Sequence, residues 1–208
     1  MTSAKKETAE AVVKAGGVAE ERDDQGRPMR ADARRNYEAL VTAARAVFSE
    51  EGGGASMEAV ARRAELGIGT LYRHFPRRID LVEAVYRNDI DELVAAAEKA
   101  VANREPMDAV AEFLHAFVRY AEGKRTFLNE LHEAFDKNPE LRLRSRQRID
   151  QAMELVIGRA QRAGSVRGDV DGSDVMQLVT PMCTNATLTA DQSERLLRMI
   201  IDGLRPPR

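Results

Sequence analysis

The chain has 208 residues, of which 43% are hydrophobic and 32% charged, and its net charge is −2 at pH 7. This composition is typical of a globular protein with one substantial domain and a smaller one. The single cysteine, Cys183, excludes an internal disulfide and any zinc site built on several thiolates. No apolar run approaches the roughly 20 residues of a membrane span and no signal core is found, so we expect a cytoplasmic protein without membrane contact.

Apolar residues recur at spacings of three and four along most of the chain, and no period-2 alternation persists. The pattern predicts an all-α fold of about nine helices. Residues 1–29 mix charges with Gly16-Gly17 and are expected to form a flexible arm. A first long helix is expected over residues 31–51, and Gly52-Gly53-Gly54 ends it because glycine suits a left-handed helix cap.

A short helix, a tight turn and a second short helix are predicted over residues 56–75. Ser56 is the expected N-cap of the first. Glu65-Leu66-Gly67 forms the turn, and Pro76 ends the second helix, which begins at about Ile68.

The rest of the chain continues as amphipathic helices, two of which are opened or closed by a proline or glycine. The expected ranges are about 78–103, 106–123, 127–138, 140–163, 173–186 and 191–204.

The second short helix has one apolar and one polar face. Leu71 and Phe75 lie four residues apart on the apolar face, with Ile68 three residues before Leu71. The opposite face carries hydrogen-bonding and cationic side chains at positions i, i+3, i+4 and i+7, namely Thr70, Arg73, His74 and Arg77. A helix anchored on one side and cationic on the other suits the major groove of DNA.

The charge distribution favours the same function. Residues 27–78 contain ten arginines and six acidic residues, a net charge of +4, so the remainder of the chain carries −6. A basic module on an acidic body can bind phosphate locally. Arg73 can contact either guanine or phosphate, and the hydroxyls of Thr70 and Tyr72 can donate to phosphate. Arg34 and Arg35 are either solvated charges or phosphate clamps.

This region resembles the tetracycline-repressor (TetR) family of bacterial transcriptional regulators. The resemblance covers about 50 residues. It rests on Ala43-Ala44-Arg45-Ala46-Val47-Phe48, on Ala61-Arg62-Arg63-Ala64 and on Gly67-Ile68-Gly69-Thr70-Leu71-Tyr72-Arg73-His74-Phe75-Pro76. It implies a DNA-binding domain at residues 30–77 and a ligand-binding and dimerisation domain at residues 78–208. The implied protein is a repressor that binds a palindromic DNA operator as a homodimer and responds to a small-molecule effector.

The resemblance also implies roles for individual residues. Gly69 and Thr70 start the recognition helix near base edges, while Tyr72, His74 and Arg78 bind phosphate and Ser56 and Met57 approach it. Together with the arginines above, the expected DNA-binding set is Arg34, Arg35, Ser56, Met57, Gly69, Thr70, Tyr72, Arg73, His74 and Arg78. Glu65 departs from the family, which usually has glycine there, and a left-handed glutamate costs roughly 1–2 kcal/mol.

The last two helices are implied to form the homodimer interface. Their expected interface residues are Val175, Leu178, Val179, Met182, Leu196, Leu197, Ile200 and Leu204. A second set either lines a pocket for an apolar or aromatic effector or simply fills the core, namely Phe113, Phe117, Tyr120, His132, Met153, Met182 and Cys183. No cofactor and no metal are expected.

Enzyme motifs fail on inspection. The run from Gly67 to Tyr72 lacks the third glycine of a dinucleotide-binding fingerprint, and His132-Glu133 lacks the second histidine of a zinc protease. A four-helix metal enzyme needs paired Glu-x-x-His motifs, and Glu112 to His115 supplies one. The remaining rival is a ligand-sequestering or scaffold protein with a vestigial DNA-binding head.

Overall fold

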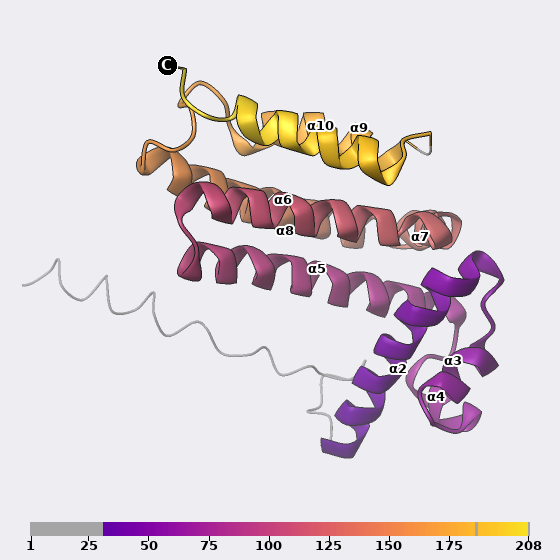
Figure 1. Ribbon diagram of the computed structural model, residues 1–208. Helices are drawn as coiled ribbons and strands as arrows, with labels where there is room; N and C mark the ends of the chain where they lie inside the picture. The colour runs from indigo at the N-terminus through magenta and orange to yellow at the C-terminus, as the bar shows by residue number, and fades with distance from the viewer. Residues whose placement is uncertain (1–30, 186, 208) are drawn as a thin grey trace, which may run out of the picture. The chain divides into compact units, whose positions relative to one another are not determined.

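The computed structural model describes residues 31–185 and 187–207. The expected flexible arm at residues 1–29 therefore lies outside the described residues. The chain divides into two compact units, residues 1–38 and 39–208. In the described part the secondary structure is helical throughout, as in Figure 1, and the predicted all-α fold is confirmed.

The described part of the first unit is the beginning of helix α2, which spans Ala31–Glu51. Arg34 and Arg35 are both exposed on this helix. Nε of Arg34 lies 2.9 Å from Oε1 of Glu38, and Arg35 pairs with Asp32. These contacts between residues three or four apart are typical of a solvent-facing helix surface.

The second unit begins with the remainder of α2, which buries Leu40, Ala44 and Phe48 along one stripe. The 3-10 helix η1, Gly52–Gly54, follows, and Gly52 has a φ of 64°. This is the left-handed conformation predicted for the glycine run. A side chain on Gly52 would also lie 3.0 Å from the carbonyl oxygen of Thr126. The short helices α3, Met57–Arg63, and α4, Ile68–His74, come next.

Long helices form the centre of the second unit. They are α5, Arg78–Asn103, α6, Pro106–Gly123, and α8, Pro139–Arg162, which lie side by side in Figure 1. Phe113, Leu114 and Met153 are fully buried between them. The 3-10 helix η2, Arg125–Phe127, and helix α7, Leu128–Lys137, connect α6 to α8. Burial of these apolar stripes is the main force that holds the helices together.

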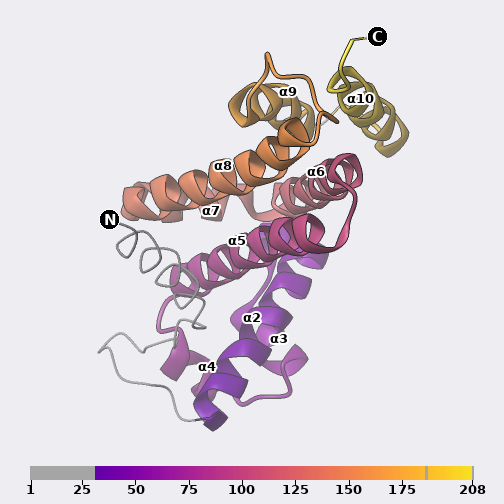
Figure 2. The same cartoon turned by 90° about the vertical axis from the view of Figure 1, so that its left-hand side faces the viewer.

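The last two helices pack against α6 and α8, as Figure 2 shows from the side. They are α9, Gly172–Thr184, and α10, Ala190–Gly203. Both start with a capping box, in which each of two side chains accepts a hydrogen bond from the backbone N–H of the other residue. The two boxes are formed by Asp171 with Asp174 and by Thr189 with Gln192. Each box satisfies backbone N–H groups that have no partner inside the helix. Val179 of α9 and Leu197 of α10 are both buried.

The predicted helix ranges agree with the structure to within one or two residues at most ends. The sequence did not predict η1 and η2 as separate 3-10 helices. In the described part of the chain, no helix is both long enough and apolar enough to cross a membrane.

Candidate DNA-binding site

The site is built on α3, a tight turn and α4. Ser56 caps α3 because its Oγ accepts a hydrogen bond from the backbone N–H of Ala59 at 3.0 Å. The turn closes where the N–H of Leu66 donates to the carbonyl of Ala61 at 3.0 Å. Glu65 in this turn has a φ of 56°. The turn therefore requires the left-handed conformation that was expected at this non-glycine residue.

Helix α4 has the two faces that the spacing predicted. Leu71 is fully buried and Phe75 almost so, and these two side chains fix the helix against the protein. Ile68, expected on the same apolar face, is half exposed at 39%. Ile68 is the first residue of α4, one turn before the buried Leu71. Tyr72 is exposed at 45%, so its hydroxyl lies on the accessible side of the helix.

The exposed side of α4 presents its donors in an ordered arrangement. Nε of Arg73 donates to the carbonyl of Gly69 at 3.2 Å, and Nη2 donates to Oγ1 of Thr70 at 3.1 Å. Arg73 therefore lies back along the helix toward its N-terminus. The same guanidinium can exchange these contacts for a base edge or a phosphate, which are stronger acceptors because they are charged or bidentate.

His74 is partly buried beside Phe75, with ring centroids 6.2 Å apart. Burial, and to a smaller extent the charge of Arg73, lower the pKa of His74 below its usual value. At neutral pH the imidazole is consequently neutral, and it donates a hydrogen bond through one ring nitrogen only. A nearby phosphate would oppose this shift.

Two residues of the predicted DNA-binding set face the protein. The side chain of Met57 is buried, so only its backbone N–H can approach a phosphate. Arg78 donates to the carbonyl of Ala55 and lies 3.3 Å from Oε1 of Glu130, with its guanidinium 4.9 Å from the Phe48 ring centroid. Their phosphate contacts stay predictions, as do those of the exposed Arg34 and Arg35.

Ion pairs hold this region together. Arg63 donates to both carboxylate oxygens of Glu50 at 3.0 and 2.9 Å, which joins α3 to the end of α2 and lowers the pKa of Glu50. Arg77 likewise binds Asp80 and lowers the pKa of that carboxyl group. Both arginines are partly neutralised by these contacts. The exposed Arg73 has no acidic partner within the described residues, so no carboxylate of this region neutralises its charge.

A partly buried cluster of charged residues between α2, α5 and the end of α6 was not expected from the sequence. Arg45 of α2 lies 2.6 Å from Oδ1 of Asp89 and 2.7 Å from Oε2 of Glu92, both on α5. Nζ of Lys124 lies 3.2 Å from the other oxygen of Asp89. Its ammonium also lies 3.4 Å from the ring centroid of Tyr120. Arg45, Asp89 and Lys124 are 35 to 79 positions apart in sequence, so no local pattern indicates the cluster.

The predicted pocket set is mostly core in the structure. Phe113, Phe117 and Met153 are buried, whereas His132 is exposed on α7. Of the seven residues, Tyr120 lines a cavity between α2, α5 and α6, and the other six line neither this cavity nor a second one beside Arg78 and Glu130. Burial raises the pKa of the Cys183 thiol to about 11, so the thiol stays protonated at neutral pH.

The predicted dimer set divides into buried and exposed residues, with Ile200 half-buried between them. Val175, Val179, Met182, Leu197 and Leu204 are buried within the chain. Leu178 and Leu196 are exposed at 60% and 38%, and Met199, absent from the prediction, is exposed at 69%. The exposed apolar side chains on α9 and α10 therefore form a smaller surface than the one predicted. The helical period separates the two groups once the direction of the core is known.

Comparison with known proteins identifies the family. Residues 40–85 match the description "Bacterial regulatory proteins, tetR family", and residues 105–206 match "Transcriptional regulator SbtR-like, C-terminal domain". A TetR transcriptional regulator from Streptomyces coelicolor is 34% identical, with a TM-score of 0.74, over 83% of this chain and 99% of that one. A TetR regulator from Mycobacterium vanbaalenii is 33% identical, with a TM-score of 0.68, over 86% of this chain and 100% of that one.

A curated relative, the HTH-type transcriptional regulator UidR of Escherichia coli, is 26% identical over 85% of this chain and 93% of its own length. The helix-turn-helix site, the helical body and these relatives define a DNA-binding transcriptional regulator. The chain belongs to the TetR family.

Proposed function

We propose that the chain is a repressor that binds a palindromic operator as a homodimer and releases it when a small molecule binds the helical body. The observation that carries this proposal is the two-faced helix α4. Leu71 and Phe75 anchor it, while Thr70, Tyr72 and Arg73 lie on its accessible side. The domain boundaries at residues 30–77 and 78–208 belong to the same proposal.

The proposed DNA contacts divide into two kinds. Arg73 reads a base edge or binds phosphate, and Gly69 and Thr70 place the start of the helix close to the bases. Tyr72 and His74 bind phosphate and fix the register without reading sequence. The backbone N–H of Met57 and the N-terminal end of α3 at Ser56 approach the phosphate on the other side of the turn.

We expect a dimer because one protomer can contact few DNA bases. A single short recognition helix reaches few base pairs, so two copies are needed for a specific operator, with half-sites about 34–36 Å apart. The exposed Leu178, Leu196 and Met199 on α9 and α10 support a homodimer formed through these two helices. Apolar side chains that gather on one surface are typical of a protein interface.

Effector response requires two conformations of the protein that differ in the position of the DNA-binding head. The ligand must bind these two conformations with different affinity. The helical body is rich in buried apolar side chains, which supports an apolar or aromatic effector. The chain from Arg45 through Asp89 to Lys124 supports a connection between the head helix α2 and this body. A ligand that changes the packing of α6 would act on α2 through these residues.

The experiment is an electrophoretic shift with the intergenic DNA beside the chain's own gene. Two protomers should bind per palindromic site, and a ligand that copurifies, detected by native mass spectrometry, should lower the affinity. Unrelated DNA of equal length is the control. Equal affinity for both fragments would contradict a specific operator and favour a vestigial head.

A further inference from the structure

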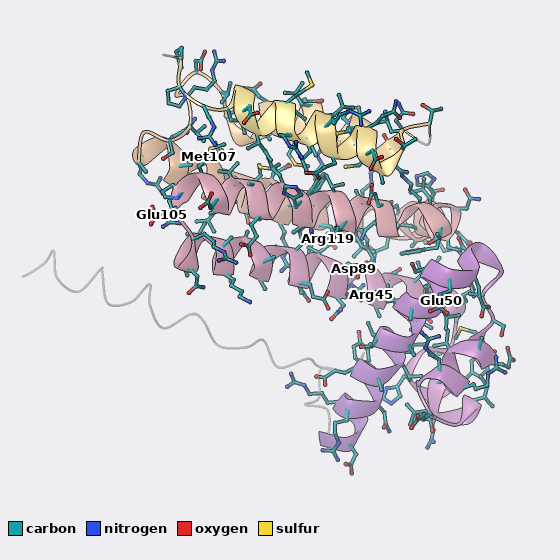
Figure 3. All side chains as sticks on the ribbon, in the orientation of Figure 1. Arg45, Glu50, Asp89, Glu105, Met107 and Arg119 are labelled. Carbon is teal, nitrogen blue, oxygen red and sulfur yellow. The ribbon has the colours of Figure 1, made fainter. Side chains whose placement is uncertain are left out.

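A cleft between α2, α5 and α6 has the size and chemistry of a ligand site. Its volume is about 370 Å³, and its walls include Arg45, Asp89, Leu93, Ala116, Arg119 and Phe127. Binding sites for small molecules typically have volumes of about 300–1,000 Å³. The cleft shares only Tyr120 with the pocket that the sequence predicted. Figure 3 labels Arg45, Asp89 and Arg119, which belong to the three helices that form it.

One part of the cleft is apolar. Leu93 and Ala96 lie on one face of α5, three residues apart, and Ala116 lies on the facing side of α6. Phe127 of η2 closes this end and is almost fully buried. The small side chains at 96 and 116 leave the space, because a larger residue at either position would fill it. An apolar group of a few carbons can cover this wall.

The other part of the cleft carries a surplus of positive charge. Arg45, Arg119 and Lys124 lie in or beside it with two carboxylates, Asp89 and Glu92. Asp89 is shared between Arg45 and Lys124, and Glu92 pairs with Arg45. Within the described residues, no acidic side chain pairs with Arg119, which is exposed one turn after Ala116. The cluster therefore lacks one negative charge.

Arg45 also has hydrogen-bonding donors that are not fully used within the protein. Its guanidinium is partly buried, and its Nε has no hydrogen-bond partner among the described residues. Nη2 contacts Asp89 as an ion pair without the alignment of a hydrogen bond. A buried donor that lacks an acceptor is unfavourable, and a ligand or a rearrangement that satisfies it is stabilised.

We propose that this cleft binds a small organic monocarboxylate, with the carboxylate on Arg119 and the apolar part on the wall of Leu93, Ala96 and Ala116. A carboxylate matches the planar guanidinium, which can donate two parallel hydrogen bonds to it. Asp89 does not repel the ligand strongly, because two cations already neutralise it. A dicarboxylate or a phosphate ester brings more charge than the cluster lacks.

Binding at this cleft would act on the head directly. Arg45 and Ser49 belong to α2, whereas Arg119 belongs to α6, so the ligand would contact both the head helix and the body. This regulatory part rests on the function proposed above. By linkage, a carboxylate that changes operator affinity must itself bind with an affinity that the operator changes by the same factor.

Calorimetric titration of the full chain with benzoate and hexanoate tests the site without DNA. At least one of the two anions should bind with a dissociation constant below about 10 mM, and its amide, benzamide or hexanamide, should bind at least about tenfold more weakly. Arg119→Gln should lower the affinity for the anion about tenfold. Arg144→Gln is the matched control, because Arg144 is an exposed arginine on α8 outside the cleft.

A second variant separates the cleft from general charge effects. Ala116→Leu keeps every charge and fills the apolar wall, so it should abolish binding while the unfolding temperature stays within about 3 °C of the original. No anion binding by the original chain, or equal binding by Arg119→Gln, would overturn the site. Binding that survives Ala116→Leu would overturn its location.

Operator titration with and without the bound anion then tests the regulatory part. The anion should change operator affinity at least about threefold in the original chain and leave Arg119→Gln unchanged. An unchanged affinity in the original chain would overturn the coupling. If no DNA fragment is bound at all, the proposed repressor function fails, while the calorimetric result still decides the site.

Discussion

Nη2 of Arg45 lies 2.6 Å from Oδ1 of Asp89, so an ion pair joins the head helix α2 to α5. Lys124 holds the second oxygen of the same carboxylate at 3.2 Å. Arg125, the next residue, donates to the carbonyl of Cys183 at 2.8 Å and so reaches the end of α9. A short stretch after α6 thus reaches the head helix α2 through Asp89 and contacts the helix proposed for dimerisation directly.

Lys124 gives this cluster a distinct pH signature. Burial lowers the pKa of Lys124 to about 8, although Asp89 opposes the shift. The unfolded lysine has a pKa of about 10.4. Between these values the unfolded chain binds more protons, so the free energy of unfolding rises with pH relative to a chain without this lysine. Below pH 8 the lysine is charged in both states and the difference is constant.

We therefore expect the difference in unfolding free energy between the original chain and Lys124→Met to rise by about 1–2 kcal/mol from pH 8 to 9.5. Urea unfolding at several pH values measures it. Lys137→Met is the control, since Lys137 is an exposed residue paired with Glu133, and its difference should stay flat. A flat difference for Lys124→Met as well would contradict the buried charged cluster.

Substitution of Glu65 by glycine should stabilise the folded chain. The φ of 56° at Glu65 is unfavourable for glutamate, and glycine adopts it freely. The greater entropy loss of glycine on folding offsets part of this gain, so Glu65→Gly should stabilise the chain by about 0.5–1 kcal/mol. Glu58→Gly, within α3, is the matched control and should destabilise by a similar amount. Thermal unfolding should show a higher unfolding temperature for Glu65→Gly and a lower one for Glu58→Gly. A lower unfolding temperature for both variants would contradict the left-handed conformation at Glu65.

The dimer surface can be tested apart from the core. Met199→Asp places a charge on the exposed face of α10 and should convert a dimer to a folded monomer in sedimentation or sizing experiments. Leu143→Asp, at an exposed leucine of α8, is the control and should leave the dimer intact. Leu197→Asp would instead unfold the chain, because that side chain is buried. A Met199→Asp dimer would argue against this interface.

Operator binding should strengthen as the pH falls. The lowered pKa of His74 makes it neutral in the free protein at pH 7.5. Phosphate contact raises that pKa, so binding takes up a proton and affinity increases toward pH 6, by up to about tenfold per pH unit. His74→Gln should remove this dependence while retaining a side-chain donor. Fluorescence anisotropy at constant ionic strength measures the effect, and an identical pH profile for both proteins would exclude His74 from the contact.

The local parts of this structure could be predicted from sequence, and the long-range parts could not. The periodicity of α4 and the cap at Ser56 depend on neighbours within a few residues, and the left-handed turn at Glu65 was expected from the family resemblance. The inward orientation of Arg78 toward Ala55 and Glu130 depends on residues 23 and 52 positions away. The cluster of Arg45, Asp89 and Lys124 is of the same kind.

The dimer residues show a further limit. Leu196 and Leu197 are equally apolar in sequence, yet one is exposed and the other buried, because the packing of α10 on its neighbours decides which side faces the core. The predicted pocket residues Phe113 and Met153 are likewise apolar core positions in the structure. Composition indicates that such residues lie inside and does not indicate where space remains among them.

The most direct measurement is the salt-dependent affinity of the original chain and of a Tyr72→Ala, Arg73→Ala double variant for the intergenic DNA beside its gene. The original chain should bind this fragment more tightly than unrelated DNA, with log affinity falling by about 0.9 per log unit of salt for each phosphate contact. The double variant should lose at least about 100-fold in affinity and show a shallower salt slope. An unchanged affinity and slope would contradict DNA binding through the exposed face of α4.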